Sequence, residues 1–387
     1  MARIASAPTV ITVSDSPSWV PAPGTFANVS LNTASEVDPC PGKGCVYSGV
    51  EGQEAVFIVW NGGAFAPDYS PYGALVCHGG GHNAYSGNEI YVFDLTTRRW
   101  SRVGAPSPYA ESQANGDGEY PDGQPFPPHT YAGVAYLPAS LGGGPKGSFL
   151  RFGFAGTPVT QWVHRMPLDA SATAPRAWSR FANLSSALSG SYWAVAFDPT
   201  RARFWVISNL NSWARGFGYV SANGTVTVLP NQGDNVDGDH ALGYCPRYDM
   251  LVHLATAGGA SHLAGRLCNG AGAFVKLRTT GPFPSPASGL EWSTAGGYFV
   301  AYPGNGSSTV YKLSPPSSDP INGTWTWTTQ TLTGVQGATP VKASGYASGQ
   351  WNGQWSRFRE VPALSSPGRP VFVYADGRTQ PVQLWAL

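Results

Sequence analysis

Charged side chains are scarce in this sequence. Of 387 residues, 23 are Lys or Arg and 22 are Asp or Glu, so the formal net charge is +1 and 12% of the chain is charged. Basic residues form no cluster longer than Arg98-Arg99. A surface that follows a nucleic-acid backbone needs clustered positive charge. We therefore expect no nucleic-acid partner.

Long apolar segments and helical patterns are also missing. No window of about 18 residues is apolar enough to cross a bilayer, and no long stretch repeats apolar residues at i, i+3, i+4 and i+7. The first 24 residues contain one Arg but no apolar core of about 7 to 15 residues before a cleavage site. We expect no membrane insertion and no Sec signal. A virion or extracellular surface reached by a non-Sec route fits this, and so does the cytoplasm.

Cysteine is rare, and the five present form no zinc-spaced pairs. Cys40 and Cys45 lie close together in a Pro/Gly-rich loop, Cys245 and Cys268 fall within one expected repeat unit, and Cys77 is left over. The spacing leaves both a Cys40–Cys45 disulfide and unpaired buried thiols open. The sequence also lacks GxSxG, Walker A and dinucleotide motifs, which argues against common serine-hydrolase and nucleotide chemistry.

Glycine, proline and aromatic residues are abundant instead. The chain has 49 Gly, 34 Pro and 49 aromatics, of which 14 are Trp, 18 Tyr and 17 Phe. Aromatic side chains supply large buried areas, while Gly and Pro end short elements in tight turns. This composition predicts an all-β protein.

A repeated pattern organises the chain. In each copy an apolar pair brackets an aromatic residue, a turn follows with Pro or small residues, and a short apolar run comes next. The aromatic anchors Tyr136, Phe197, Tyr244 and Trp292 follow one another at intervals of 61, 47 and 48 residues. Repeats of about 40 to 60 residues are typical of propeller blades.

One unit, Leu75 to Val103, carries the clearest family signal. It has three consecutive glycines after a strand, then Asn88 to Asp94 as a second strand, then Trp100 beyond the turn. In these features it resembles the kelch family, and the segments 128–138 and 355–362 resemble landmarks of bacterial and phage galactose-oxidase-type propellers. The resemblance implies a fold and no particular activity. A copper-radical site would need two Tyr, two His and a cross-linkable Cys, which cannot be placed here, so we expect no copper chemistry.

We therefore predict one β-propeller domain over residues 1–387, with four-stranded kelch-like blades in 50–387 and a closing strand and loop in 1–49. Open sheet edges at the two ends would be exposed, so Thr9 to Val29 is expected to pair with the last blade near Val382 to Trp385. Six blades are predicted, with seven as the alternative. The six units are 50–103, 129–182, 191–230, 240–280, 288–334 and 343–387.

Several polar residues precede the expected inner strands and are candidates for one mouth of the propeller. If these strand starts face the axis, they form a cationic, aromatic-lined pocket. The alternative is that they bond to carbonyl groups of the blades, or that the histidines merely flank turn glycines. The candidate ligand-binding residues are His78, His82, His129, Tyr131, His240, Arg357 and Arg359, and the catalytic candidates among them are His129, Tyr131 and Arg357.

No metal site is predicted. His78 and His82 are separated by three glycines, and on a loop this spacing does not fix both rings on one face. Two oxygen-rich loops, 115–122 and 234–239, could supply Ca²⁺ ligands, but neither has EF-hand spacing, and Asx turns explain them equally. No cofactor is expected. The long loops 30–47 and 106–128 are expected to bind or cover something.

Two functions fit these residues, and the sequence leaves open whether the protein is an enzyme. The first is a non-catalytic binding or structural propeller that recognises glycans and belongs to a larger assembly, such as a phage virion tail or surface complex. Its partners would be glycans or other protein subunits. The second is a polysaccharide lyase, in which His129 or Tyr131 removes the proton beside a uronate carboxylate while Arg357 neutralises the acid.

Overall fold

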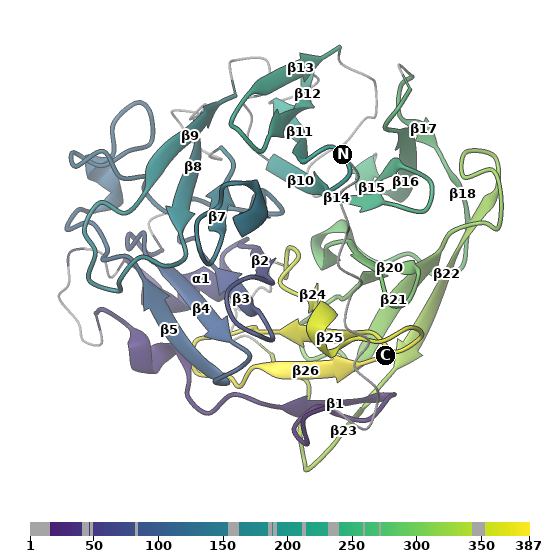
Figure 1. Cartoon of the computed structure of the whole chain (residues 1–387), viewed down its shortest axis with the longest axis horizontal. Coiled ribbons are helices and arrows are strands. Elements are labelled where there is room, and N and C mark those ends of the chain that lie inside the picture. The colour runs from purple at the N-terminus through teal and green to yellow at the C-terminus, as the bar shows by residue number, and fades with distance from the viewer. Residues whose placement is uncertain are drawn as a thin grey trace, which may run out of the picture.

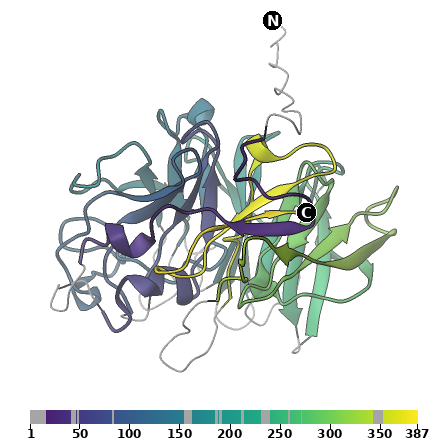
Figure 2. The ribbon, with the colours of Figure 1, turned by 90° about the horizontal axis from the view of Figure 1, so that it is seen from below.

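The computed structural model describes residues 16–40, 46, 49–81, 84–153, 162–184, 188, 192–210, 214–230, 240–257, 260–270, 272–342 and 353–387. Six β-sheets are arranged around a central axis (Figure 1), which makes the fold a six-bladed β-propeller. The predicted fold class and the count of six are confirmed. Seen from the side, the blades form a broad, low ring (Figure 2).

Each blade is built around an antiparallel meander whose first strand lies nearest the axis. The strands are short, and tight turns rich in Gly and Pro join them, as the sequence repeat indicates. From the axis outward, blade 1 has β2 (Gly63–Ala66), β3 (Ala74–Cys77), β4 (Ile90–Asp94) and β5 (Arg99–Val103); blade 2 has β6 (Val134–Leu137), β7 (Ser148–Arg151), β8 (Trp162–Pro167) and β9 (Ser179–Asn183); blade 3 has β10 (Tyr192–Asp198), β11 (Arg203–Leu210), β12 (Ala214–Ser221) and β13 (Val226–Leu229).

The remaining three blades continue the meander with differences at their outer edges. Blade 4 has β14 (His240–Cys245), β15 (Met250–Ala257), β16 (Ala260–Leu267) and β17 (Val275–Lys276); blade 5 has β19 (Glu291–Ser293), β20 (Tyr298–Ala301), β21 (Thr309–Ser314), β22 (Thr324–Thr331) and β18 (Arg278–Thr280); blade 6 has β24 (Arg359–Glu360), β25 (Val371–Tyr374), β26 (Gln383–Ala386), β1 (Thr25–Asn28) and β23 (Thr333–Gly334).

Helix is confined to single turns in the described chain. The α-helix α1 (Ala55–Ile58) is joined by 3-10 turns η2 (Ala34–Val37), η3 (Gly52–Glu54), η4 (Glu111–Gln113), η5 (Ala139–Leu141), η6 (Pro286–Ser288) and η7 (Pro362–Leu364). Within the described ranges, none of these helices has the length and apolar character that a membrane span requires.

The core lies between blades. Strand β25 shows the principle, since all four of its residues are buried and successive side chains point to opposite faces. Val371 and Val373 pack with blade 1, while Phe372 and Tyr374 pack with blade 5. Six such apolar clusters fill the six interfaces between neighbouring blades. A blade covered on both faces needs apolar residues at successive positions, which explains the apolar runs of the sequence.

The N-terminal strand closes the ring as predicted. Strand β1 pairs antiparallel with β26, from Thr25 opposite Ala386 to Asn28 opposite Gln383. The rings of Phe26 and Trp385 stack with centroids 4.3 Å apart. Figure 1 shows β1 beside the C-terminal strands at the edge of the ring. The earlier part of the predicted strand, residues 9–15, lies outside the described residues.

The predicted unit boundaries are wrong at two places. Strand β18 was expected in the fourth unit, but it runs parallel to β22 of blade 5. Strand β23 was expected in the fifth unit, but it pairs parallel with β1 of blade 6. Each strand leaves its own meander and covers the outer edge of the next blade, which shortens the exposed edge there.

The cysteines divide into two groups. Cys40 is disulfide-bonded, whereas Cys77, Cys245 and Cys268 are free, buried thiols. Cys245 and Cys268, which fall within one expected repeat unit, form no disulfide with each other. The remaining cysteine, Cys45, lies outside the described residues.

Candidate functional site: the axial pocket

A pocket of about 350 Å³ lies on the propeller axis, where the inner strands of the six blades end. The sequence anchors of the repeat form its wall. The equivalent positions in the six blades are Phe65, Tyr136, Phe197, Tyr244, Trp292 and Glu360. Two residues further on, each chain reaches the pocket rim, at Pro67, Pro138, Pro199, Pro246, Thr294 and Pro362. Proline donates no backbone hydrogen bond, so it ends a strand at this level.

The layer one residue before the aromatic anchors creates the space. Four blades place a small residue there: Ala64, Ala135, Ala196 and Gly243. The other two blades break the repeat and place charged residues at the equivalent positions, Glu291 and Arg359. Within the described part of this layer, the small residues leave a volume on the axis, and two long, charged side chains, Glu291 and Arg359, enter it.

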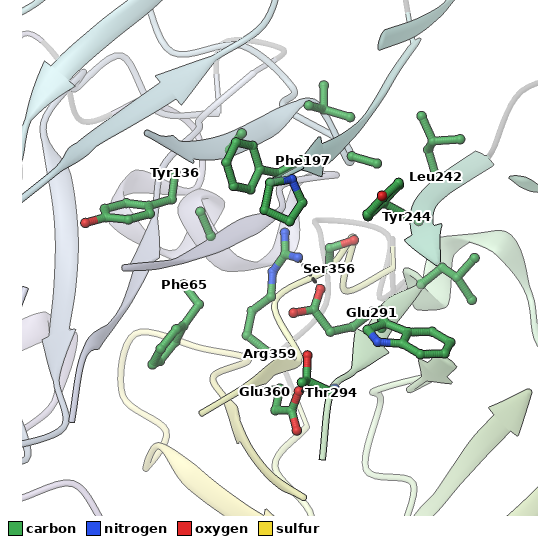
Figure 3. Close-up of a pocket in the computed structure, with 18 of the residues that line it drawn as sticks. Phe65, Tyr136, Phe197, Leu242, Tyr244, Glu291, Thr294, Ser356, Arg359 and Glu360 are labelled. Carbon is green, nitrogen blue, oxygen red and sulfur yellow. Dashed lines mark hydrogen bonds and ion pairs between the residues drawn. The ribbon is translucent and has the colours of Figure 1, made fainter. Parts of the chain in front are cut away.

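Arg359 and Glu291 point toward each other within this volume (Figure 3). The Nη1 of Arg359 donates to Oε2 of Glu291 at 2.5 Å, and Nε and Nη2 both donate to the Gly63 carbonyl, at 3.0 and 2.7 Å. The side chains keep 17% and 23% of their exposure. Arg359 thus joins blades 5, 6 and 1 while remaining open to the pocket.

Glu360 occupies the anchor position of blade 6 but is committed to the neighbouring turn. Its carboxylate accepts hydrogen bonds from Ser293 Oγ at 3.0 Å and from the backbone amides of Thr294 and Ala295 at 2.7 and 3.2 Å. Burial raises the pKa of Glu360, and these three hydrogen bonds oppose the rise. Its main physical role is to hold blade 5 against blade 6.

The tyrosines of the wall turn their hydroxyl groups away from the axis. Tyr136 Oη donates to Asp68 at 2.8 Å, and Tyr244 Oη donates to Asp249 at 2.9 Å; Asp68 lies in the β2–β3 turn of blade 1 and Asp249 in the β14–β15 turn of blade 4. Because the polar ends are satisfied elsewhere, the ring surfaces are what these residues offer to the pocket. In the close-up, Phe65, Tyr136 and Phe197 lie on one side of the pocket and Tyr244 on the other (Figure 3).

A second, mainly aromatic layer lies five residues before the first. We call it the aromatic cap; its described members are Trp60, Tyr131, Tyr192, Ala287 and Trp355. Trp60, Tyr131 and Trp355 all have left-handed backbone, with φ of 49°, 45° and 45°. Such a conformation costs about 1–3 kcal/mol per bulky residue. Tertiary packing around the axis must offset it.

Backbones of different blades meet at the aromatic cap. The amide of Tyr131 donates to the Trp60 carbonyl at 2.8 Å, and that of Trp355 donates to the Ala287 carbonyl at 3.1 Å. At Gly62, an added Cβ would stand 2.3 Å from the carbonyl oxygen of Tyr131 and 2.4 Å from that of Trp355. Only glycine permits this approach. The axis is therefore narrow at the cap, and the pocket lies toward the other face.

The predicted catalytic pair belongs to the cap and not to the pocket wall. His129 Nδ1 and Tyr131 Oη are 3.1 Å apart, and the two residues are 3% and 5% exposed. The His129 ring packs on Trp60, and the Tyr131 ring packs on Tyr192 and Trp355. The structure thus brings His129 and Tyr131 together but buries both.

The other predicted histidines lie apart from this pair. His78 is fully buried between blades 1 and 2, with Nδ1 3.0 Å from the Glu89 carbonyl, and burial lowers its pKa to about 3. His240 begins β14, and its Nδ1 lies 3.1 Å from Nε2 of the buried His253. Neither lines the axial pocket. His82 lies outside the described residues.

Arg357 is a buried structural cation. Its side chain and that of Asp376 are both fully buried, with Nη2 of Arg357 2.8 Å from Oδ1 of Asp376. The guanidinium also donates to the carbonyl groups of Ala375, Asn61 and Gly353. Arg359, two residues on, is the one predicted site residue that lines the pocket among those the structure describes.

The oxygen-rich loop 115–122, for which the sequence left calcium ligation and Asx turns open, is held by the protein itself. Asn115 Oδ1 accepts from the amides of Asp117 and Glu119, as in an Asx turn. Glu119 is bonded to His164 and Arg180. Burial alone would raise the pKa of Glu119, but these hydrogen bonds lower it to about 2. The second loop, 234–239, lies outside the described residues.

One group of side chains in the described ranges has metal-ligand spacing. Donor atoms of Asp198, Asp249 and Cys268 lie within 4.8 Å of one another. Arg201 already bonds both carboxylates, at 3.0 Å to Asp198 and 2.5 Å to Asp249. A guanidinium thus supplies the positive charge there, and the group does not define a metal site.

The fold and pocket define a six-bladed β-propeller with a ligand-sized axial cavity. No known family and no curated protein matches the sequence. Among solved structures, the chain is similar to a gluconolactonase from Xanthomonas campestris, with 10% identity, TM-score 0.45 and coverage of 94% of this chain and 96% of that one. An Aleuria aurantia lectin in complex with alpha-methyl-L-fucoside gives 10% identity, TM-score 0.43 and coverage of 86% and 93%.

A third similar structure is the PQQ-bound aldose sugar dehydrogenase of Streptomyces coelicolor, with 13% identity, TM-score 0.42 and coverage of 95% and 100%. At these identities and scores the similarities concern the propeller fold alone. The more specific kelch-like assignment stays a prediction.

Glu291, Phe65 and the role of the small-residue layer escaped the sequence interpretation. A signal existed for each. Phe65 stands two residues before Pro67, as Tyr136 stands before Pro138. Glu291 and Arg359 immediately precede the anchor positions, where four other blades have Ala or Gly. A charged residue that interrupts a small-residue position of a repeat is the pattern that would have found this site.

Proposed function

We propose that the protein is a non-catalytic binding propeller whose axial pocket takes a saccharide unit of a glycan. One observation carries the proposal: the Glu291–Arg359 pair enters a space that the repeat otherwise keeps empty, inside an aromatic wall. The cavity, about 350 Å³, falls at the lower end of the range for ligand pockets, about 300–1,000 Å³. Apolar walls with a few polar groups fit a ring that has both apolar faces and hydroxyl edges.

Trp292 and Trp162 provide a matched test. Both are half-buried, but Trp292 lines the pocket and Trp162 stacks under Arg180 on blade 2, with the guanidinium carbon 4.4 Å from the ring centroid. After a glycan array has identified a binder, calorimetry measures its Kd. Trp292→Ala is expected to weaken binding by about 30-fold, because truncating a central tryptophan costs about 2 kcal/mol. Trp162→Ala should leave Kd within about twofold.

An array without binders would refute glycan recognition. Binding that survives Trp292→Ala and is lost in Trp162→Ala would move the site to blade 2. Thermal unfolding of both variants verifies that each is folded at the assay temperature.

The lyase alternative stays a prediction. His129 and Tyr131 form a hydrogen-bonded pair of the right chemistry, but both are buried in the aromatic cap, and Arg357 is bonded to Asp376. A substrate would reach them only after the cap opened. Incubation with a panel of acidic polysaccharides tests this, since a lyase produces ultraviolet absorbance from unsaturated uronate. We expect no rise.

We further propose that the propeller works within a larger assembly, such as a virion tail or surface complex. The low content of charge supports packing against other subunits, as do exposed apolar residues on the outer strands of blades 3 and 4: Val228, Leu267 and Val275. Sedimentation of the purified protein tests self-assembly, and a monomer at all concentrations would count against it.

A further inference from the structure

The Glu291–Arg359 pair holds its charged groups in a fixed orientation. Arg359 uses three N–H groups in the described contacts, two for the Gly63 carbonyl and one for Glu291 Oε2. A guanidinium has five N–H groups in one plane. Since the Gly63 carbonyl belongs to a strand backbone, it fixes the plane of the guanidinium before any ligand arrives.

This geometry leaves donors and an acceptor side by side. Two N–H groups of Arg359 and the Oε1 atom of Glu291 have no described protein contact, and both residues line the pocket. A sugar hydroxyl both donates and accepts a hydrogen bond. Two adjacent hydroxyls therefore match the pair, one accepting from Arg359 and the other donating to Glu291.

A carboxylate ligand would be attracted by Arg359 but repelled by Glu291. It can accept from Arg359, but it must approach Glu291, whose carboxylate is 2.5 Å from the guanidinium. The only cation lining the pocket among the described residues is Arg359, while Glu291 and Glu360 are both carboxyl groups. Like charges at such short range are strongly unfavourable where water is partly excluded.

We propose, building on glycan binding at the axial pocket, that the Glu291–Arg359 pair selects neutral sugars with adjacent hydroxyl groups and rejects the corresponding uronates. The aromatic wall then packs against the apolar face of the sugar ring, and the ion pair forms hydrogen bonds with its hydroxyl groups. Arg359 is a specificity residue here, distinct from the acid-neutralising role expected for arginine in a lyase.

Paired ligands test the proposal on the wild-type protein. Methyl glycosides of glucose, galactose and mannose are titrated beside the matching methyl uronosides, which differ only at C6. At least one neutral sugar should bind ten or more times tighter than its uronate. A uronate that binds tighter than its neutral partner would overturn this selectivity while leaving glycan binding intact. Absence of binding in both series would instead count against the proposed function itself.

Glu291→Gln assigns the selectivity to its residue. The amide keeps an acceptor and removes the negative charge, so the preference for the neutral sugar should fall at least tenfold. Asp117→Asn is the control, because Asp117 also pairs with an arginine, Arg180 at 3.1 Å, but neither residue lines the pocket. An unchanged preference in Glu291→Gln, or an equal loss in Asp117→Asn, would contradict the assignment.

Discussion

Replacing Arg357 by Met should destabilise the propeller strongly without touching the pocket. Arg357 and Asp376 are fully buried and 2.8 Å apart, and Arg357 also bonds the Asn61 carbonyl of the segment leading into blade 1. Removing one partner of a buried ion pair typically costs about 3–5 kcal/mol, because the other charge stays in a low-dielectric site. Met fills most of the lost volume, so the electrostatic loss dominates.

The expected thermal shift follows from the size of the chain. Unfolding entropy of about 2.1 cal/mol/K per residue gives about 0.8 kcal/mol/K for 387 residues. A loss of about 3–5 kcal/mol then lowers Tm by about 4 to 6 °C. Scanning calorimetry at neutral pH measures this shift.

The double variant Arg357→Met with Asp376→Asn separates charge burial from packing. Asp376→Asn removes the carboxylate that has lost Arg357, so it should recover at least half of the free energy of unfolding that Arg357→Met loses. A Tm within about 1 °C of wild type for Arg357→Met would refute the reasoning, and so would a double variant less stable than either single one. Kd for the glycan should be unchanged in both, which would not hold if Arg357 contacted the ligand.

Three further predictions concern closure, protonation and the thiols. Trp385→Ala removes a fully buried ring stacked on Phe26 and should cost about 3–5 kcal/mol in thermal unfolding, whereas the Trp162→Ala control should cost much less; equal losses would refute a special role of ring closure. Burial and nearby Arg151 lower the pKa of His164 to about 4, against an ordinary value of 6.5. Between these pH values the unfolded chain binds more protons than the folded one, so the free energy of unfolding should rise from pH 4 to 6.5 and then level off. His78, with a pKa of about 3, acts in the same direction, so His164→Gln should flatten the slope of the free energy of unfolding against pH only in part, and an unchanged slope would contradict the assignment. Burial raises the thiol pKa to about 12 for Cys77, about 11 for Cys245 and about 12 for Cys268. A thiol reagent at pH 8 should therefore label these three cysteines only after denaturation, and rapid labelling of the native protein would disprove their burial.

The fold was largely predictable because the repeat has a local physical cause. An aromatic residue followed by proline two positions later sets both the blade contact and the strand end, so Tyr136, Phe197 and Tyr244 identified inner strands from sequence alone. The strand exchange by β18 and β23 was not predictable in the same way. Its parallel pairings depend on which blade edge is free, and that is a property of the closed ring.

The site was less predictable because it depends on register between blades. Glu291 and Arg359 are 68 positions apart in sequence and meet only because their strands begin at the same height on the axis. The sequence placed His129 and Tyr131 at one mouth of the propeller, because the residues that precede the inner strands lie together near the axis. The sequence did not reveal that aromatic residues from neighbouring blades would cover them.

Ring closure by β1 also sets an order of events during synthesis. Asn28 and Gln383, bonded side chain to side chain across the closing pair, are 355 positions apart. The first described strand therefore remains an unpaired edge while five blades are translated, and blade 6 is completed only when its last strand leaves the ribosome. Unpaired edges invite association with other chains. Blade 6 thus combines β1 with β24, β25 and β26, so the nascent propeller keeps an exposed sheet edge that favours aggregation until β26 has been translated.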